Sequence, residues 1–156
     1  MRITGLLRGG VRQAVLGGGL LCFWAVAASG QQLSVSGSPS AMAITSATAG
    51  LPPNDAVNTA TTYTVKGKAN KSYKITASLN SNMPAGMTLT IDMVAPAGAV
   101  DDGIVTLSTT AREVVGNITN TNNFTGAITY TLSATPAAGV VTSQSRTVTF
   151  TLTTWP

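Results

Sequence analysis

The sequence predicts an all-β protein, an antiparallel two-sheet sandwich of the Ig-like type with about seven strands. Three observations support this prediction. Run after run alternates apolar residues with Thr, Ser or charged residues, as expected for strands with one buried face. Prolines fall between the runs, where a missing N–H removes no ladder hydrogen bond. After the first 30 residues, no stretch carries a long apolar period of 3.6 residues, so helices are not expected.

The alternating runs define the expected strands, and threonine suits their outer faces because its β-branch favours extended backbone. In chain order the runs are residues 61–67, 73–79, 87–93, 105–108, 128–134 and 147–153. Residues 112–118 fit either a short strand or one helical turn, and the pattern leaves this choice open. Residues 66–71 predict a hairpin loop. Short strands at this spacing favour a sandwich, with a closed barrel as the alternative.

The N-terminal 30 residues have the three-part pattern of a secretory signal peptide. Arg2, Arg8 and Arg12 precede an apolar run at 15–28, and small residues follow before Gln31. This run of about 14 residues is shorter than the ~20 that a membrane-spanning helix needs. We therefore expect cleavage before Gln31 or Ser29, an exported protein (at the cell surface, in the periplasm or outside the cell), and no transmembrane helix after cleavage.

The organisation that follows is a signal peptide at 1–30, an N-terminal strand and irregular segment at 31–53, and a β-sandwich domain at 54–156. The mature part is about 126 residues long, which is enough for one packed core. The only cysteine, Cys22, lies in the signal, so no disulfide is expected to help that core.

The charge of the mature part argues against nucleic-acid binding. The whole chain has a net charge of +4, but three of its nine basic residues lie in the signal, which leaves about +1. Binding to nucleic acid needs clustered cations that neutralise phosphates. Charged residues make up 9% of the chain, against about 25% in typical proteins. A surface of Thr, Ser and Asn repels its own copies weakly, which suits assembly and equally suits an ordinary exported β-domain.

The usual side chains of catalysis are nearly absent. The chain has no histidine, and its one cysteine is in the signal, so neither a Ser/His/Asp nor a Cys/His arrangement can form in the mature part. Asp92 and Glu113 could pair as in a glycosidase, but with so few acids we interpret them as surface charges. Asp101 and Asp102 could contribute to a calcium site, but calcium takes six to eight oxygen ligands, far more than two aspartates supply. We therefore interpret Asp101, Asp102 and Gly103 as a turn. We expect no enzyme, no catalytic residue, no metal and no other cofactor.

One cluster of charge stands out in the mature part. It consists of Lys66, Lys68, Lys71 and Lys74. These lysines could form a surface that touches anionic glycans or lipid headgroups. The alternative is that they keep the loop soluble and block edge-to-edge pairing of strands.

Three segments carry a resemblance to a known family. They are Leu-Ser-Val-Ser-Gly-Ser-Pro at 33–39, Leu-Ser-Thr-Thr-Ala-Arg-Glu at 107–113, and the strand at 147–153 that ends the chain. With the export signal, they resemble bacterial fimbrial subunits of the alpha-fimbrial (CS1-like) group. The resemblance implies donor-strand exchange, in which an N-terminal segment fills a groove in a neighbouring copy. Leu33 and Val35 would then fill pockets, and Gly37 would lie in the same register.

The sequence therefore predicts a non-enzymatic, exported structural or adhesive surface protein that assembles with itself or with other surface proteins. The alternative function is a secreted glycan-binding module. Such a module needs an exposed aromatic platform, for which the candidates are Trp155, Phe124, Tyr63 and Tyr73. The two tyrosines fall on the apolar faces of their runs, which indicates that they belong to the core.

Overall fold

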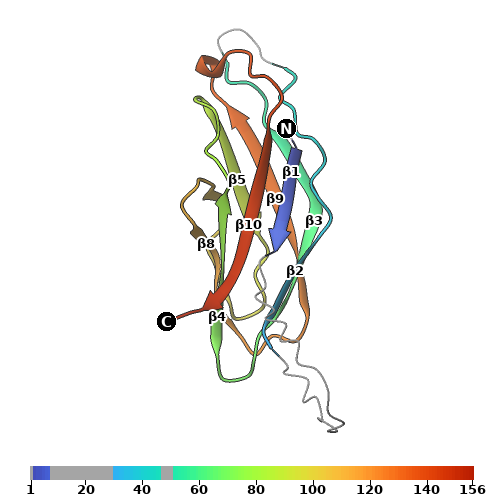
Figure 1. Ribbon diagram of the computed structural model, residues 1–156, viewed down its shortest axis with the longest axis vertical. Helices are drawn as coiled ribbons and strands as arrows, with labels where there is room; N and C mark the ends of the chain where they lie inside the picture. The colour runs from blue at the N-terminus through green and yellow to red at the C-terminus, as the bar shows by residue number, and fades with distance from the viewer. Residues whose placement is uncertain (1, 8–29, 47–50) are drawn as a thin grey trace, which may run out of the picture.

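The computed structural model describes residues 2–7, 30–46 and 51–156, and these form two β-sheets that face each other (Figure 1). One sheet has the order β1-β10-β4-β8-β6 and the other the order β2-β3-β9-β5-β7. The strands are β1 (Arg2–Leu7), β2 (Gln32–Ser36), β3 (Ala56–Lys66), β4 (Ser72–Leu79), β5 (Met87–Met93), β6 (Val100–Asp101), β7 (Val105–Thr106), β8 (Arg112–Thr119), β9 (Phe124–Ala134) and β10 (Ser145–Thr154). A short 3₁₀ helix, η1 (Pro136–Ala138), follows β9.

The all-β prediction and the two-sheet arrangement are confirmed, while the expected number of about seven strands is too low for the described residues. The structure has ten strands there, because β6 and β7 span only two residues each and β1 lies within the predicted signal. Residues 112–118, for which the sequence left two choices, belong to strand β8. Residues 8–29, which hold most of the predicted signal, lie outside the described residues.

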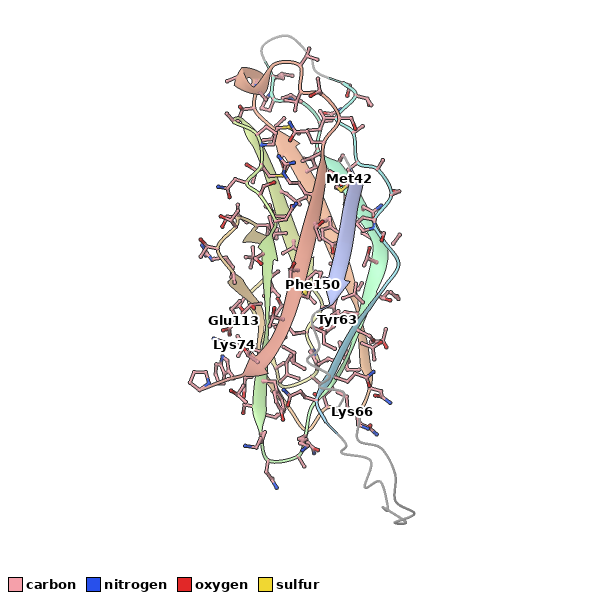
Figure 2. The ribbon with its side chains drawn as sticks, in the orientation of Figure 1. Met42, Tyr63, Lys66, Lys74, Glu113 and Phe150 are labelled. Atoms are coloured by element: carbon pink, nitrogen blue, oxygen red, sulfur yellow. The ribbon has the colours of Figure 1, made fainter. Side chains whose placement is uncertain are left out.

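Every second side chain of the main strands points into the space between the sheets. In β4, Tyr73, Ile75, Ala77 and Leu79 are buried and alternate with half-buried residues. The rest of the core comes from both sheets: Tyr63, Val65, Leu89, Ile91, Met93, Val105, Leu107, Val114, Val115, Ile118, Ile128, Tyr130, Leu132, Val148 and Phe150. Figure 2 labels Tyr63 and Phe150 within this layer. Two residues near the N-terminus of the sandwich, Leu33 and Met42, complete it.

From β3 onward, each successive strand lies in the opposite sheet from the strand before it. The predicted hairpin at 66–71 is therefore wrong. β3 pairs with β2 and β9, β4 pairs with β10 and β8, and the loop between them crosses from one sheet to the other. The alternation in a sequence shows which face of a strand is buried, and it carries no information on the sheet to which the strand belongs.

Tyr63 joins the second sheet to the loop that follows β5. Its hydroxyl donates a hydrogen bond of 2.6 Å to the backbone oxygen of Val94, and its ring meets Phe124 edge to face at 6.1 Å. Gly126 lies opposite Tyr63 in the register, and a Cβ there would come within 2.7 Å of the tyrosine ring and 2.6 Å of the Val94 oxygen. The ring thus fills the space that the glycine leaves open, and a larger residue at 126 would displace it.

Asparagine supplies the left-handed backbone that several turns need. Asn70, Asn117, Asn120 and Asn123 all have positive φ angles. Asparagine tolerates this region better than other residues with a Cβ. Asn117 lies where the register between β4 and β8 shifts, so its conformation belongs to a bulge in β8.

Thr61 is the polar residue of the core that lacks a partner among the described residues. It follows an irregularity in β3, is fully buried, and its hydroxyl makes no hydrogen bond. A buried hydroxyl without a partner loses its hydration and gains nothing in return.

We predict that Thr61→Val stabilises the protein by about 1 kcal/mol, because valine has nearly the same shape and no hydroxyl to desolvate. Equilibrium denaturation in urea measures the change. Thr76→Val, at a half-buried position on the outer face of β4, is the matched control and should shift the free energy of unfolding by less than about 0.5 kcal/mol. A loss of stability in Thr61→Val would show that the hydroxyl has a partner after all.

Candidate functional site

The two lateral sides of the sandwich differ in how their edges are protected. On one side the sheets end in β6 and β7, which are two residues long. Very short edge strands offer little backbone for another chain to pair with. On the other side, one sheet ends in β2, which has five residues. The other sheet ends in β1, which pairs with the ten-residue strand β10. The side bordered by β10 and β2 is therefore the one with a long edge.

The edge of β10 carries the one parallel pairing among the described strands. β1 runs alongside β10 with Arg2 opposite Ser145, Gly5 opposite Val148 and Leu7 opposite Phe150. The other described pairings are antiparallel. β1 comes from the predicted signal, and in Figure 1 it lies beside the long red strand β10. Apart from Arg146, β10 has no charged residue. Its backbone on this side is thus suited to strand addition.

The three residues predicted for a partner strand lie at the other border of this side. Leu33 and Val35 are in β2, which pairs antiparallel with β3 of the same chain, with Leu33 opposite Val65 and Val35 opposite Tyr63. Leu33 is buried and Val35 packs against the core. Gly37 follows the strand with a φ of 76°, so it makes a turn and does not extend the pairing. In this chain the segment is thus the edge strand of the sheet β2-β3-β9-β5-β7.

The four lysines do not share one face. Lys66 ends β3 in one sheet, and Lys74 lies in β4 of the other, while Lys68 and Lys71 are exposed in the connecting loop. Lys74 forms an ion pair of 3.2 Å with Glu113. Figure 2 shows Lys74 beside Glu113 and away from Lys66. The cluster therefore wraps around one end of the sandwich.

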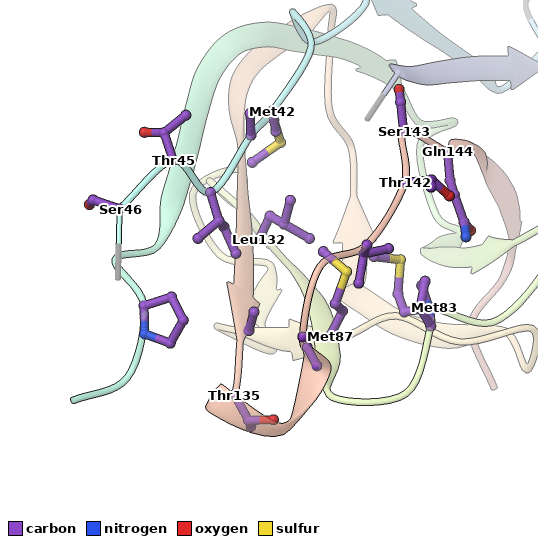
Figure 3. A pocket seen from close by; sticks show the side chains of 18 of the residues that line it. Met42, Thr45, Ser46, Met83, Met87, Leu132, Thr135, Thr142, Ser143 and Gln144 are labelled. Carbon is purple, nitrogen blue, oxygen red and sulfur yellow. The ribbon is translucent and has the colours of Figure 1, made fainter. Parts of the chain in front are cut away.

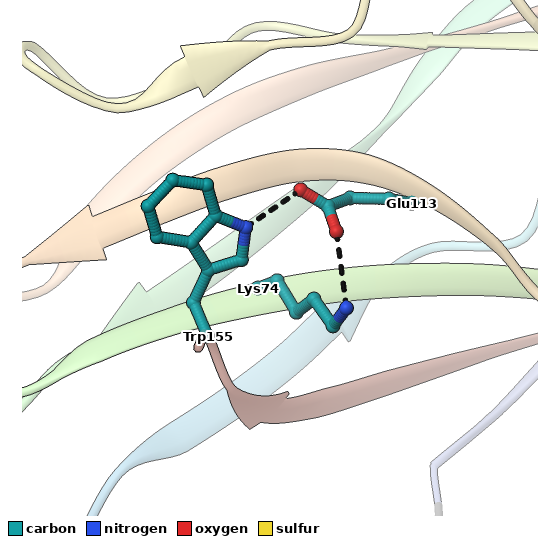
Figure 4. A network of polar contacts seen from close by, with 3 residues as sticks. All are labelled: Lys74, Glu113 and Trp155. Carbon is teal, nitrogen blue, oxygen red and sulfur yellow. Dashed lines mark hydrogen bonds and ion pairs between the residues drawn. The ribbon is translucent and has the colours of Figure 1, made fainter.

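Glu113 also holds the C-terminal tryptophan. Its Oε1 accepts a hydrogen bond of 3.0 Å from Trp155 Nε1, while its Oε2 faces Lys74 (Figure 4). Asp92 lies in β5, on the outer face of the other sheet. The two carboxylates thus lie on different sheets and do not form the paired arrangement that glycoside hydrolysis uses.

Asp101 is the last residue of β6, and Asp102 follows it. The Oδ1 atom of Asp101 accepts a hydrogen bond of 2.7 Å from the backbone N–H of Gly103, whose φ is 64°. This is the turn that the sequence predicts. Desolvation, followed by the charges of Glu113 and Asp101, raises the pKa of Asp102 above its ordinary value.

The aromatic candidates for a glycan platform are mostly enclosed. Tyr63 and Tyr73 are buried, as their alternation predicts, and Phe124 packs against the core. Burial, with a smaller effect of the Asp101 charge, raises the pKa of Tyr63. Trp155 is half-buried, and its indole nitrogen is occupied by Glu113.

The structure also contains a cavity that sequence reasoning missed. It has a volume of about 960 Å³ and lies at the end of the sandwich where β9 ends and β10 begins (Figure 3). Its lining residues come from five parts of the chain, within residues 41–46, 51–53, 83–87, 132–139 and 141–146. The irregular segment after β2 is thus one wall of a pocket. No periodic pattern marks such a site, since it is assembled from loops.

Comparisons with protein-family models, with curated proteins and with solved structures give no match for this chain. Within the described residues, no helix has the length and apolar character needed to cross a bilayer. The same residues contain no group of three or more Cys, Asp or Glu side chains arranged to hold a metal ion.

We predict that Asp102→Asn raises the melting temperature at pH 7, by no more than about 2 °C because the site is largely exposed. A raised pKa in the folded state means that ionisation of Asp102 opposes folding, so its contribution is favourable at low pH and is lost as the pH rises through the folded pKa. The advantage of the variant should therefore vanish near pH 3. Thermal unfolding followed by circular dichroism at both pH values measures it, and a lower melting temperature at pH 7 would contradict the prediction.

Proposed function

We propose that the protein is an exported, non-enzymatic structural or adhesive surface subunit of the fimbrial type. In this proposal an Ig-like sandwich assembles with its own copies by strand addition. The observation that carries the proposal is the edge of β10, where a strand from outside the sandwich runs parallel over six residues. Removal of the predicted signal would take β1 away and leave ten residues of backbone N–H and C=O groups at that edge without a strand.

The proposed donor is β2 of a neighbouring copy. In its own chain β2 pairs over only five residues. The described residues between β2 and β3 form neither helix nor strand, so a long connection is available to carry β2 elsewhere. Exchange of β2 between copies would therefore give up a pairing of five residues with β3.

The side chains of β2 match the edge that would receive them. Placed parallel to β10 with Leu33 beside Val148, the strand brings Val35 beside Phe150, so all four apolar side chains face the core. Val148 and Phe150 are both buried. Main-chain hydrogen bonds would supply the affinity, and the alternate side chains would supply the register. Low surface charge favours the approach of identical copies.

Export is the first premise to test. When the full chain is expressed with its own N-terminus in a Gram-negative host, the exported protein should lack residues 1–30, and intact-mass spectrometry should place its first residue at Gln31 or Ser29. The replacement of Leu20 and Leu21 by Arg interrupts the apolar run and should abolish both cleavage and export. Full-length protein recovered outside the cytoplasm would contradict the prediction.

Strand exchange predicts a specific disulfide between copies. In the proposed register Ser34 of one copy stands beside Thr149 of the next, and neighbouring strands lie about 5 Å apart, within the range that a disulfide spans. Mature protein carrying Ser34→Cys and Thr149→Cys should form a ladder of covalent oligomers on non-reducing gels. The reducing agent should collapse this ladder to monomers.

A matched pair distinguishes exchange from pairing within one chain. Ser34 stands opposite Thr64 in the described register, so the Ser34→Cys and Thr64→Cys variant reports on β2 in its own sheet. If the Ser34/Thr64 variant forms its disulfide within single chains and the Ser34/Thr149 variant stays monomeric at high concentration, β2 pairs within its own chain and the proposed assembly is wrong.

A further inference from the structure

The cavity at the end of the sandwich lies at the mouth of the core, between the two sheets. Leu132 of β9 forms part of its floor and is almost fully buried, while Leu51 at its rim is 60% exposed. Its volume of about 960 Å³ falls in the range of about 300–1,000 Å³ that is typical of pockets for small molecules. The pocket thus runs from the apolar core to the surface.

The wall of the cavity is apolar and adaptable. Met42, Met83 and Met87 line it together with Ile44, Leu132 and Val141 (Figure 3). Three of the five methionines of the chain therefore gather here. Methionine has an unbranched, polarisable side chain that adjusts to the shape of an apolar ligand. No aromatic residue is among the described residues that line the cavity, so these residues offer no stacking surface for a sugar ring.

Among the described residues that line this cavity, one is charged, and it is a cation. Arg146 lies in β10 two residues before the buried Val148, so it is on the face that points between the sheets. No carboxylate is among the residues that line the cavity. Within the described part of the chain, the recorded ion pair is Lys74–Glu113, so no carboxylate there neutralises Arg146.

Neutral acceptors hold the guanidinium in place without using all its donors. Nε donates to the Asn82 backbone oxygen at 3.1 Å, Nη1 to the Ser145 backbone oxygen at 2.9 Å, and Nη2 to Gln144 Oε1 at 2.5 Å. A guanidinium has five N–H donors. One N–H on each Nη therefore has no hydrogen-bond partner among the described residues. Such N–H groups are donors that the oxygens of a carboxylate can accept.

We propose that the cavity binds a long-chain carboxylate, with the hydrocarbon tail against the methionine-lined wall and the carboxylate on Arg146. The tail removes apolar surface from water, and the carboxylate supplies the negative charge that the site lacks. The hydroxyls of Thr142 and Ser143 lie at the exposed rim, where they add polar contacts around the head of the ligand. This binding is independent of the assembly proposed above and would hold for a monomer.

Titration calorimetry with octanoate, decanoate and laurate, each below its critical micelle concentration, tests the proposal. The probe is added to the full chain as the host processes it, after lipid has been extracted. Affinity should rise roughly fourfold with each added methylene, because every CH₂ buries further apolar area. Laurate should bind at least about tenfold more tightly than 1-dodecanol, which has the same tail and no charge.

Arg146→Gln should remove that preference of about tenfold for laurate over 1-dodecanol. Arg112→Gln, at an exposed position of β8 outside the cavity, is the matched control and should bind laurate as the wild type does. Melting temperatures of both variants show whether either change unfolds the protein.

A second pair of variants covers the case in which Arg146→Gln fails to fold. Val141 lines the cavity, while its neighbour Val140 is fully exposed and does not. Val141→Glu should repel the carboxylate and weaken laurate binding by about tenfold or more, and Val140→Glu should leave it unchanged. Absence of laurate binding to the wild type, or equal losses in the two valine variants, would overturn the proposal. Uptake of laurate and dodecanol with equal affinity would also overturn the role of Arg146.

Discussion

The structure depends on one constraint: two sheets, each apolar on one face only, must cover each other completely. No disulfide within the chain can share this task, because Cys22 is its only cysteine. Since each strand from β3 onward enters the opposite sheet, neighbours within a sheet are distant in sequence. The sheets therefore cannot form separately from local hairpins, and both must assemble together. Such a fold must lose the entropy of closing long loops before distant contacts compensate for that loss, so we expect it to fold slowly. The loops that cross between the sheets are a direct result of the same constraint.

Once the apolar faces are covered, the unpaired backbone groups at the sheet edges remain exposed to pairing with other chains. The side that ends in β6 and β7 is protected by the shortness of those strands. The opposite side is bordered by β10, whose ten residues are mostly threonine, valine and other uncharged residues. β1 is placed there in a parallel register, and this strand belongs to the segment that we expect to be cleaved. If β1 is removed as we propose, the edge of β10 would be open to pairing, and this would favour an assembling subunit over an isolated binding module.

The sequence predicts the faces of the strands well and their partners poorly. The alternation at 73–79 correctly identifies Tyr73, Ile75 and Leu79 as core. The hairpin predicted at 66–71 is wrong, because the alternation does not show which sheet a strand joins, and β3 and β4 lie in different sheets. Two-residue strands such as β6 are too short to show a period. The left-handed Asn117 and the bulge of β8 explain why residues 112–118 fit no clean pattern. The cavity could not be predicted, since its walls come from segments that only the fold brings together.

The edge and the cavity share a strand, and they use different parts of it. Strand addition requires the backbone N–H and C=O groups of β10, while the cavity requires the side chain of Arg146, which points between the sheets from the same strand. Arg146, Val148 and Phe150 are side chains of β10 that point between the sheets. Arg146 is the first of them along the chain and lies where the apolar core opens to solvent. A cation is tolerated at such a position because three neutral acceptors hold it and water reaches it. Arg146 is thus the one charged side chain among the described residues that line the cavity, and it is the group on which the proposed selection of a carboxylate depends.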